Sequence, residues 1–66
     1  MSNKQINKLA ETMNAVEFIN ELETRDVAFE FDNVDNVMDF NDGLLNVIVN
    51  DTAFLFADGK LDSVSY

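Results

Sequence analysis

The spacing of apolar residues changes once along this chain, and that change constrains the fold more than any other feature. In the N-terminal third, apolar residues recur at steps of three and four, the spacing that gives a helix one apolar face. These residues are Ile6, Leu9, Met13, Val16, Ile19 and Leu22. From Asp26 onward the spacing becomes two, with Val27, Phe29 and Phe31 alternating with other residues. Such alternation is typical of a half-buried strand, so the sequence predicts a helical segment followed by β-structure.

The helical segment has a clear start but no constant apolar face. Ser2 and Gln5 have the spacing of a capping box, in which each side chain accepts the other residue's backbone N–H. At about 100° per residue, the apolar residues up to Met13 share one side, whereas Ile19 and Leu22 lie nearly opposite. The apolar face therefore rotates about halfway along the segment.

Two explanations of this rotation stay open at the level of sequence. One is a kink near residues 12–14, where Asn14 and Glu17 have the spacing of a second capping box. The other is a single helix that contacts two bodies, its own sheet and a partner.

The remainder of the chain is expected to form four or five strands. They are residues 27–32, a shorter and weaker segment at 37–40, and residues 44–49, 53–57 and 61–66. Turns rich in Asn, Asp and Gly separate the later segments, at residues 41–43, 50–52 and 58–59. Short turns between consecutive strands make an antiparallel meander. We therefore predict an α+β fold in which an N-terminal helix packs on this meander, with residues 1–66 forming one domain.

Composition argues against catalysis, metal binding and a cofactor. The chain has neither cysteine nor histidine, so structural zinc and the commonest general base are both excluded. No serine or threonine has a neighbouring base to activate it. Residues 39–43 superficially resemble a calcium-binding loop, but Gly43 comes one residue early and no glutamate closes the loop. We expect a protein that is not an enzyme.

The length and hydropathy of the chain bear on its stability, its oligomeric state and its cellular location. A chain of 66 residues buries only about 60% of the surface that its unfolded form exposes, so its stability is marginal. Oligomerisation is the usual remedy when disulfides and metals are missing, and we expect a homodimer.

No apolar run approaches the roughly 20 residues that span a membrane, and polar residues interrupt the N-terminus where a signal peptide would be apolar. We expect a cytoplasmic protein with no membrane contact.

Negative charge is concentrated in the predicted strands and their turns. The formal net charge is −9, and every charged residue from Asp26 to Asp58 is an acid. Glu30 and Asp32 are predicted to share the outward face of one strand, because Phe29 and Phe31 are expected to face the core. The candidate partner-binding residues are Glu30, Asp32, Asp35, Asp39 and Asp42, the last three extending the row beyond the first strand.

A row of spaced carboxylates resembles the phosphates of a nucleic-acid strand in sign and in rough spacing. The sequence therefore predicts a DNA mimic, whose partner is a protein with a basic surface, such as a nucleic-acid-binding enzyme. Direct binding to nucleic acid is disfavoured, because four basic residues stand against thirteen acids. The alternative is that the acids serve only solubility.

A second candidate surface is apolar. If the other residues of their strands face the core, then Leu44, Ile48 and Leu55 point outward and form a candidate apolar interface. The alternative function is therefore a homo-oligomeric structural or adaptor module, which binds through an apolar sheet face or a strand edge. These strands would not bind at all if both of their faces were covered within one chain.

In size, charge and lack of catalytic residues, the chain is similar to the small acidic proteins that phages make to disable host machinery, including anti-restriction and anti-CRISPR inhibitors. The similarity is one of general character, without a shared motif, so it transfers no residue roles. It implies a non-enzymatic viral inhibitor that acts in the cytoplasm of the host cell.

Overall fold

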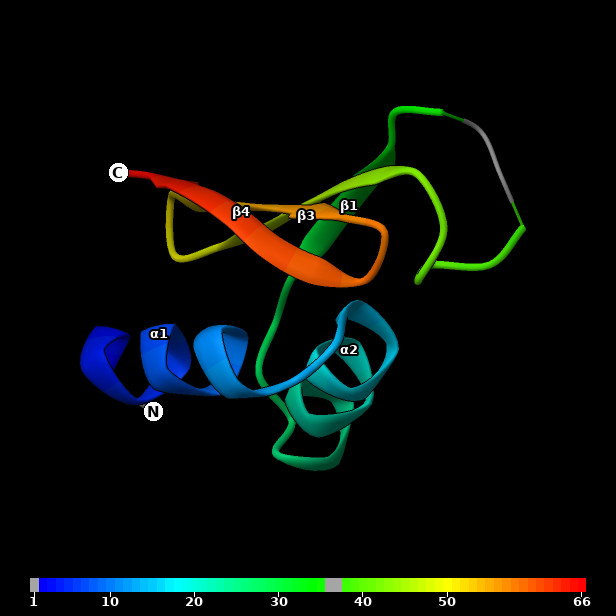
Figure 1. Cartoon of the computed structure of the whole chain (residues 1–66). Helices are drawn as coiled ribbons and strands as arrows, with labels where there is room; N and C mark the ends of the chain where they lie inside the picture. The colour runs from blue at the N-terminus through cyan, green and yellow to red at the C-terminus, as the bar shows by residue number, and fades with distance from the viewer. Residues whose placement is uncertain (1, 36–37) are drawn as a thin grey trace.

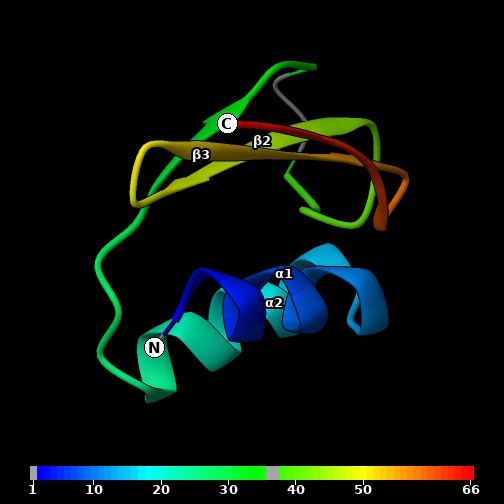
Figure 2. The ribbon, with the colours of Figure 1, turned by 90° about the vertical axis from the view of Figure 1, so that its left-hand side faces the viewer.

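The chain forms two layers in the computed structural model, which describes residues 2–35 and 38–66. One layer holds the helices α1 (Asn3–Thr12) and α2 (Ala15–Thr24). The other is an antiparallel sheet of β1 (Glu30–Asn33), β2 (Leu44–Val49), β3 (Thr52–Ala57) and β4 (Lys60–Ser65), in that order. Figures 1 and 2 show both helices on the same face of the sheet. The predicted α+β fold is confirmed, with four strands among the described residues.

The helical segment is broken at Met13 because a second N-cap follows it at once. The Ser2 side chain accepts the Gln5 backbone N–H, and the Gln5 side chain accepts the Ser2 N–H. Asn14 and Glu17 repeat this arrangement at the start of α2. The break turns both apolar faces toward one sheet, which explains their rotation in the sequence without a second body. Neither helix is long and apolar enough to cross a membrane, and no other helix occurs in the described ranges.

The core lies between the helices and the inner face of the sheet. Phe18 of α2 contacts Phe54 and Phe56 of β3, with ring centroids 5.4 Å apart in both pairs. Helix α1 lies against β4. Burial alternates along β2 and β3 as the pattern of two predicts. The other buried apolar residues are Ile6, Ala10, Ala15, Ile19, Leu22, Leu45, Val47 and Val49.

The first turn of α2 is tied to one end of the sheet by its backbone N–H groups. The first N–H groups of a helix have no partner inside the helix. Ala15 donates its N–H to the Gly59 carbonyl at 3.0 Å, and Val16 donates to Asn41 Oδ1 at 3.1 Å. These two bonds join α2 to the β3–β4 turn and to the segment that precedes β2.

The first strand starts later than its alternation suggests, because the chain must first end α2. Asp26 adopts a φ of 59° and donates its N–H to the Glu23 carbonyl, while Val27 donates to the Leu22 carbonyl at 2.9 Å. This pair of bonds is a Schellman motif, the common way to close a helix C-terminus. Strand β1 therefore begins at Glu30, and the prediction of a strand from residue 27 was wrong.

The described part of the weak strand predicted at residues 37–40 does not form a strand either. Val37 lies outside the described residues, and residues 38–40 have no strand structure. Asp39 Oδ1 accepts the Asn41 N–H at 2.9 Å, and the Asp39 carbonyl accepts the Asp42 N–H at 2.9 Å. An aspartate that bonds to nearby backbone favours a turn over a strand. The connection between β1 and β2, described at residues 34–35 and 38–43, is called the β1–β2 loop below.

Candidate functional site

The outward face of β1 carries two carboxylates. Glu30 pairs with Ile48 and Asp32 pairs with Asn46 across the ladder, which places both acids on the sheet face opposite the helices. Both residues are exposed. Residues two apart on a strand are separated by about 6.6–6.8 Å. The predicted orientation of Glu30 and Asp32 is confirmed, while their part in binding stays a prediction.

Phe31, between these two acids, is not buried as predicted. It pairs with Val47 and so lies on the core side of the sheet, but 49% of it is exposed. The reason is position, because β1 is an edge strand with a neighbour on one side only. Its ring is covered in part by Phe40, with centroids 4.9 Å apart in an edge-to-face arrangement. The strand edge therefore exposes an aromatic surface beside its acids.

The three acids of the β1–β2 loop do not continue the row as a strand would. Asp35 Oδ2 accepts the Leu44 N–H at 2.7 Å, and Asp39 accepts the Asn41 N–H as described above. Asp42 is exposed and follows these two within the same loop. The prediction that these three acids extend the row is thus corrected. Two acids lie on a strand and three lie in the loop, where Asp35 and Asp39 also bond to the backbone of the loop or of β2.

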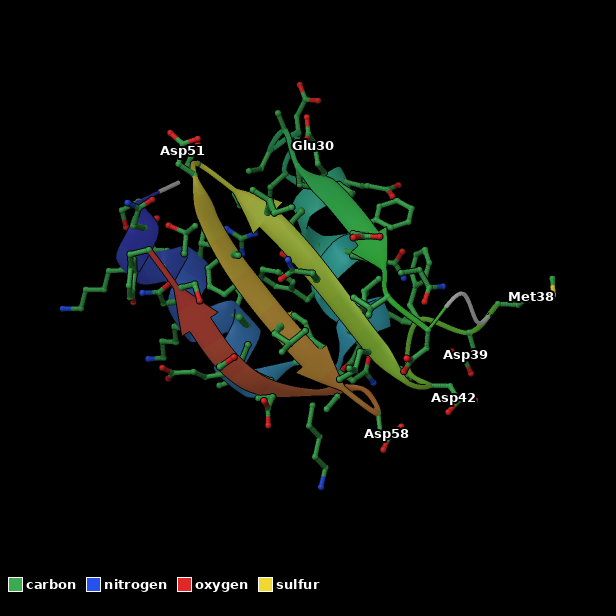
Figure 3. All side chains as sticks on the ribbon, turned by 90° about the horizontal axis from the view of Figure 1, so that it is seen from above. Glu30, Met38, Asp39, Asp42, Asp51 and Asp58 are labelled. Atoms are coloured by element: carbon green, nitrogen blue, oxygen red, sulfur yellow. The ribbon has the colours of Figure 1, made fainter. Side chains whose placement is uncertain are left out.

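The acids at opposite ends of β1 are far apart on the sheet. Figure 3 shows Glu30 at one end and Asp39 and Asp42 at the other, where Asp58 of the β3–β4 turn joins them. Asp58 Oδ1 accepts the Gly43 N–H at 3.0 Å, so this acid also supports the loop. Sequence analysis did not connect Asp58 with the loop, because only the fold brings the two turns together. We call Glu30, Asp32, Asp35, Asp39 and Asp42 the acidic edge.

The four basic residues are distributed over α1, the end of α2 and the start of β4. Lys4 and Lys8 are on α1 and Lys60 begins β4, the element against which α1 lies. The remaining basic residue, Arg25, is bonded to Glu21 at 2.6 Å, one turn away on α2. Because α1 lies against β4 and β1 is the other edge of the sheet, Lys4 and Lys8 are separated in space from Glu30 and Asp32. Lys60, by contrast, follows Asp58 by two residues, and Figure 3 shows Asp58 near Asp39 and Asp42.

The outer face of the sheet carries the predicted apolar residues. Leu44, Ile48 and Leu55 are half-buried and lie opposite the helices, as their alternation predicts. Across the ladder Ile48 pairs with Ala53, and Leu44 with Ala57. Whether this face binds anything stays a prediction.

The most exposed large apolar residues are elsewhere. They are Phe31, Val34, Met38 and Tyr66, at 49%, 54%, 101% and 83% exposure. In the sequence, Phe31, Val34 and Met38 lie between or beside residues of the acidic edge. Sequence analysis missed them because it assigned Phe31 to the core and Met38 to a strand. The available signal was the placement of Val34 and Met38 among aspartates and asparagines, in a segment that favours turns.

No group of three or more acids within residues 2–35 and 38–66 is arranged to hold a metal ion. Within its described residues, the acidic edge presents exposed carboxylates and the exposed apolar side chains of Phe31, Val34 and Met38. Comparisons with protein families, with curated proteins and with solved structures find no match to this chain.

Proposed function

We propose that this chain is a non-enzymatic binding protein, which uses the acidic edge to occupy the basic nucleic-acid-binding surface of another protein. The observation that carries the proposal is the position of Glu30 and Asp32. Both are exposed on an edge strand, and their ladder pairing fixes them on the outward face. Partner arginines and lysines that normally contact phosphates would instead contact these carboxylates.

The distribution of charge supports such an encounter. A net charge of −9 exceeds the magnitude of about 2–8 that suits the solubility of a small domain. Self-repulsion on that scale lowers the stability of the folded state, which solubility alone does not require. With Glu30 and Asp32 on β1 and with Lys4 and Lys8 on α1, charge is unevenly distributed, and the resulting electric field orients the molecule as it approaches a basic surface.

The test is a charge reversal with a matched control. The double variant Glu30→Lys and Asp32→Lys reverses the outward face of β1. The control, Glu11→Lys and Asp62→Lys, changes the net charge by the same amount at two exposed positions on α1 and β4. The immobilised protein and both variants are exposed to a bacterial lysate. Bound proteins are released by stepwise salt or by duplex DNA, and identified by mass spectrometry.

If the proposal is right, the wild-type protein captures nucleic-acid-binding proteins from the lysate. These proteins are released at moderate salt or on addition of duplex DNA. The variant at Glu30 and Asp32 should recover much less of them than the control. Recovery that duplex DNA does not reduce, or that is equal for the two variants, would contradict the proposal.

A second candidate function is self-association or adaptor binding through the outer sheet face. The observation in its favour is the stripe of Leu44, Ile48 and Leu55, which no helix covers in the described structure. An apolar interface responds little to salt, whereas the charged interface weakens as ions screen it. A dimer that persists at high salt in analytical ultracentrifugation, and that Leu55→Ser dissociates, would favour this second function.

A further inference from the structure

Two large apolar side chains of the β1–β2 loop are exposed. Met38 is fully exposed at 101%, and Figure 3 shows it pointing away from the body of the protein. Val34, the first residue of the loop, is 54% exposed and donates its N–H to the Leu44 carbonyl at 3.0 Å. Single exposed apolar residues are normal on a protein surface. Here two of them share one loop, with the exposed ring of Phe31 just before it, so the grouping calls for a physical explanation.

The base of this loop is held by bonds from three directions. Asp35 accepts the Leu44 N–H, Asp58 accepts the Gly43 N–H, and Asn41 accepts the Val16 N–H. A side chain that projects from an anchored base loses less conformational freedom on binding than one on a free segment. These bonds hold residues 35, 41 and 43–44 at the base of the loop, which also carries the exposed side chains of Val34 and Met38.

Acids surround these apolar side chains along the chain. Asp32 precedes Val34, Asp35 follows it, and Asp39 follows Met38. Protein interfaces commonly combine an apolar centre with a polar rim, and methionine is enriched at such centres. Methionine also adapts its shape to the surface that it meets, because it is unbranched and polarizable. The arrangement therefore has the composition of a binding surface rather than that of a solubilising loop.

We infer that Val34 and Met38 are apolar anchors of the acidic edge, and that they dock on a protein surface where an apolar patch is bordered by lysine or arginine. Complementarity of charge identifies this partner, because the carboxylates beside the anchors would face the basic border. The inference rests on the proposed function and deepens it. The acids bring the partner and orient it, and burial of the two anchors then slows its release.

The test uses two synthetic peptides that separate charge from apolar contact. One is an amphipathic helical peptide with leucines on one face and lysines on the other, a minimal copy of the partner chemistry. The other is an oligolysine with the same number of lysines. Affinities for the wild-type protein are measured by fluorescence anisotropy. They are compared with those of the double variant Val34→Ser and Met38→Ser, and of Tyr66→Ser, which removes an exposed apolar residue at the end of the chain.

The anchor variant should bind the leucine–lysine peptide about tenfold more weakly than the wild-type protein and bind oligolysine equally well. Tyr66→Ser should bind both peptides as the wild-type protein does. Circular dichroism and urea unfolding confirm that the variants fold, which exposed positions allow.

The other outcomes distinguish the two proposals. If the anchor variant binds the leucine–lysine peptide as tightly as the wild-type protein, or if Tyr66→Ser loses as much affinity, the anchor inference is wrong. The acidic edge can still bind in that case, as a loss of oligolysine binding in the variant Glu30→Lys and Asp32→Lys would show. If the wild-type protein binds neither peptide, the proposed function fails, and the anchor inference fails with it.

Discussion

The connections between the strands of this sheet are built in two different ways. The β2–β3 and β3–β4 connections are two-residue turns with positive φ at both positions. Asn50 and Asp51 have φ values of 51° and 63°, and Asp58 and Gly59 have values of 51° and 87°. This is the signature of a type I′ turn, whose twist matches that of the strands it joins. The β1–β2 loop is instead long, and its described residues, 34–35 and 38–43, include some that bond to distant parts of the chain.

The difference concerns where the stabilising contacts come from. A type I′ turn needs only two central residues that tolerate positive φ. The β1–β2 loop needs Val16 of α2 and Asp58 of the β3–β4 turn to complete the bonds at its base. The same loop carries the exposed side chains of Val34 and Met38. The conformation of the two-residue turns therefore follows from local rules, although the β3–β4 turn also bonds to α2 and to the loop. The surface proposed to bind is the part whose conformation the rest of the molecule has to support.

The largest effect is expected from Gly43→Ala, at the base of the loop. Gly43 has a φ of 71°, and an added Cβ would lie 2.6 Å from Asp35 Oδ2 and 3.0 Å from Asp35 Cβ. A left-handed conformation costs a non-glycine residue roughly 1–2 kcal/mol. Displacing Asp35 from the Leu44 N–H costs about 1 kcal/mol more. We expect the free energy of unfolding, measured with urea, to fall by about 2–3 kcal/mol.

A double-mutant cycle with Asp35→Ala separates the two causes. When the carboxylate is already absent, Gly43→Ala should cost only the backbone term, and the coupling should be about 1 kcal/mol. Equal costs in the two backgrounds would show that contact with Asp35 is not what constrains this position.

A smaller loss is expected from Asn41→Ala, which removes the bond between the loop and α2. The Val16 N–H then has no acceptor, and loss of a helix-capping bond typically costs about 1 kcal/mol, with a range of roughly 0.5–2 kcal/mol. Asn41→Asp keeps an acceptor and places a negative charge beside a helix N-terminus, which is favourable. In urea unfolding it should lose less than half as much stability as Asn41→Ala. Equal losses would mean that the bond to Val16 does not hold the loop.

The contrast between features set by neighbouring residues and features set by distant contacts also explains how much of the fold could be predicted from the sequence. The two capping boxes and the turn at residues 58–59 follow from residues that are close in sequence, and the structure confirms them. The break near residue 13 was one of two explanations left open, and the structure selects it. The turn predicted at residues 50–52 has only Asn50 and Asp51 between the strands, because Thr52 begins β3. The late start of β1 was missed because Asp26 takes the left-handed position that glycine usually fills at the end of a helix. The strand predicted at residues 37–40 failed because Asp39 forms a turn with its neighbours.

The candidate site was predictable only where it belongs to a strand. Alternation placed Glu30 and Asp32 outward without any knowledge of the fold. The exposure of Phe31 depends on β1 being an edge strand, which is a property of strand order that alternation does not contain. Likewise, the bond from the Leu44 N–H to Asp35 depends on how the loop closes, which the alternation of residues does not reveal. Sequence analysis could count the acids of the loop but could not separate those that bind backbone from those that face solvent.

The smallest effect, and the only gain, is expected from Asp51→Gly in the β2–β3 turn. Type I′ turns favour Asn-Gly at their two central positions, and here Asp51 occupies the second position with a φ of 63°. Glycine removes the strain of that conformation but is also more flexible in the unfolded chain, so a net gain of about 0.5 kcal/mol is expected. Asp51→Asn is the control, because it removes the same charge without removing the strain.

The gain should appear as a higher urea midpoint with an unchanged slope. The stabilisation by Asp51→Gly and the destabilisation by Gly43→Ala should also be additive in the double variant, because the two sites are far apart. Figure 3 places Asp51 at the end of the sheet opposite Asp42 and Asp58. If Asp51→Gly and Asp51→Asn stabilise equally, the gain comes from reduced self-repulsion and says nothing about the turn. If the gain depends on the residue at position 43, the hairpin and the loop are coupled, and the division between local turns and a supported loop does not hold.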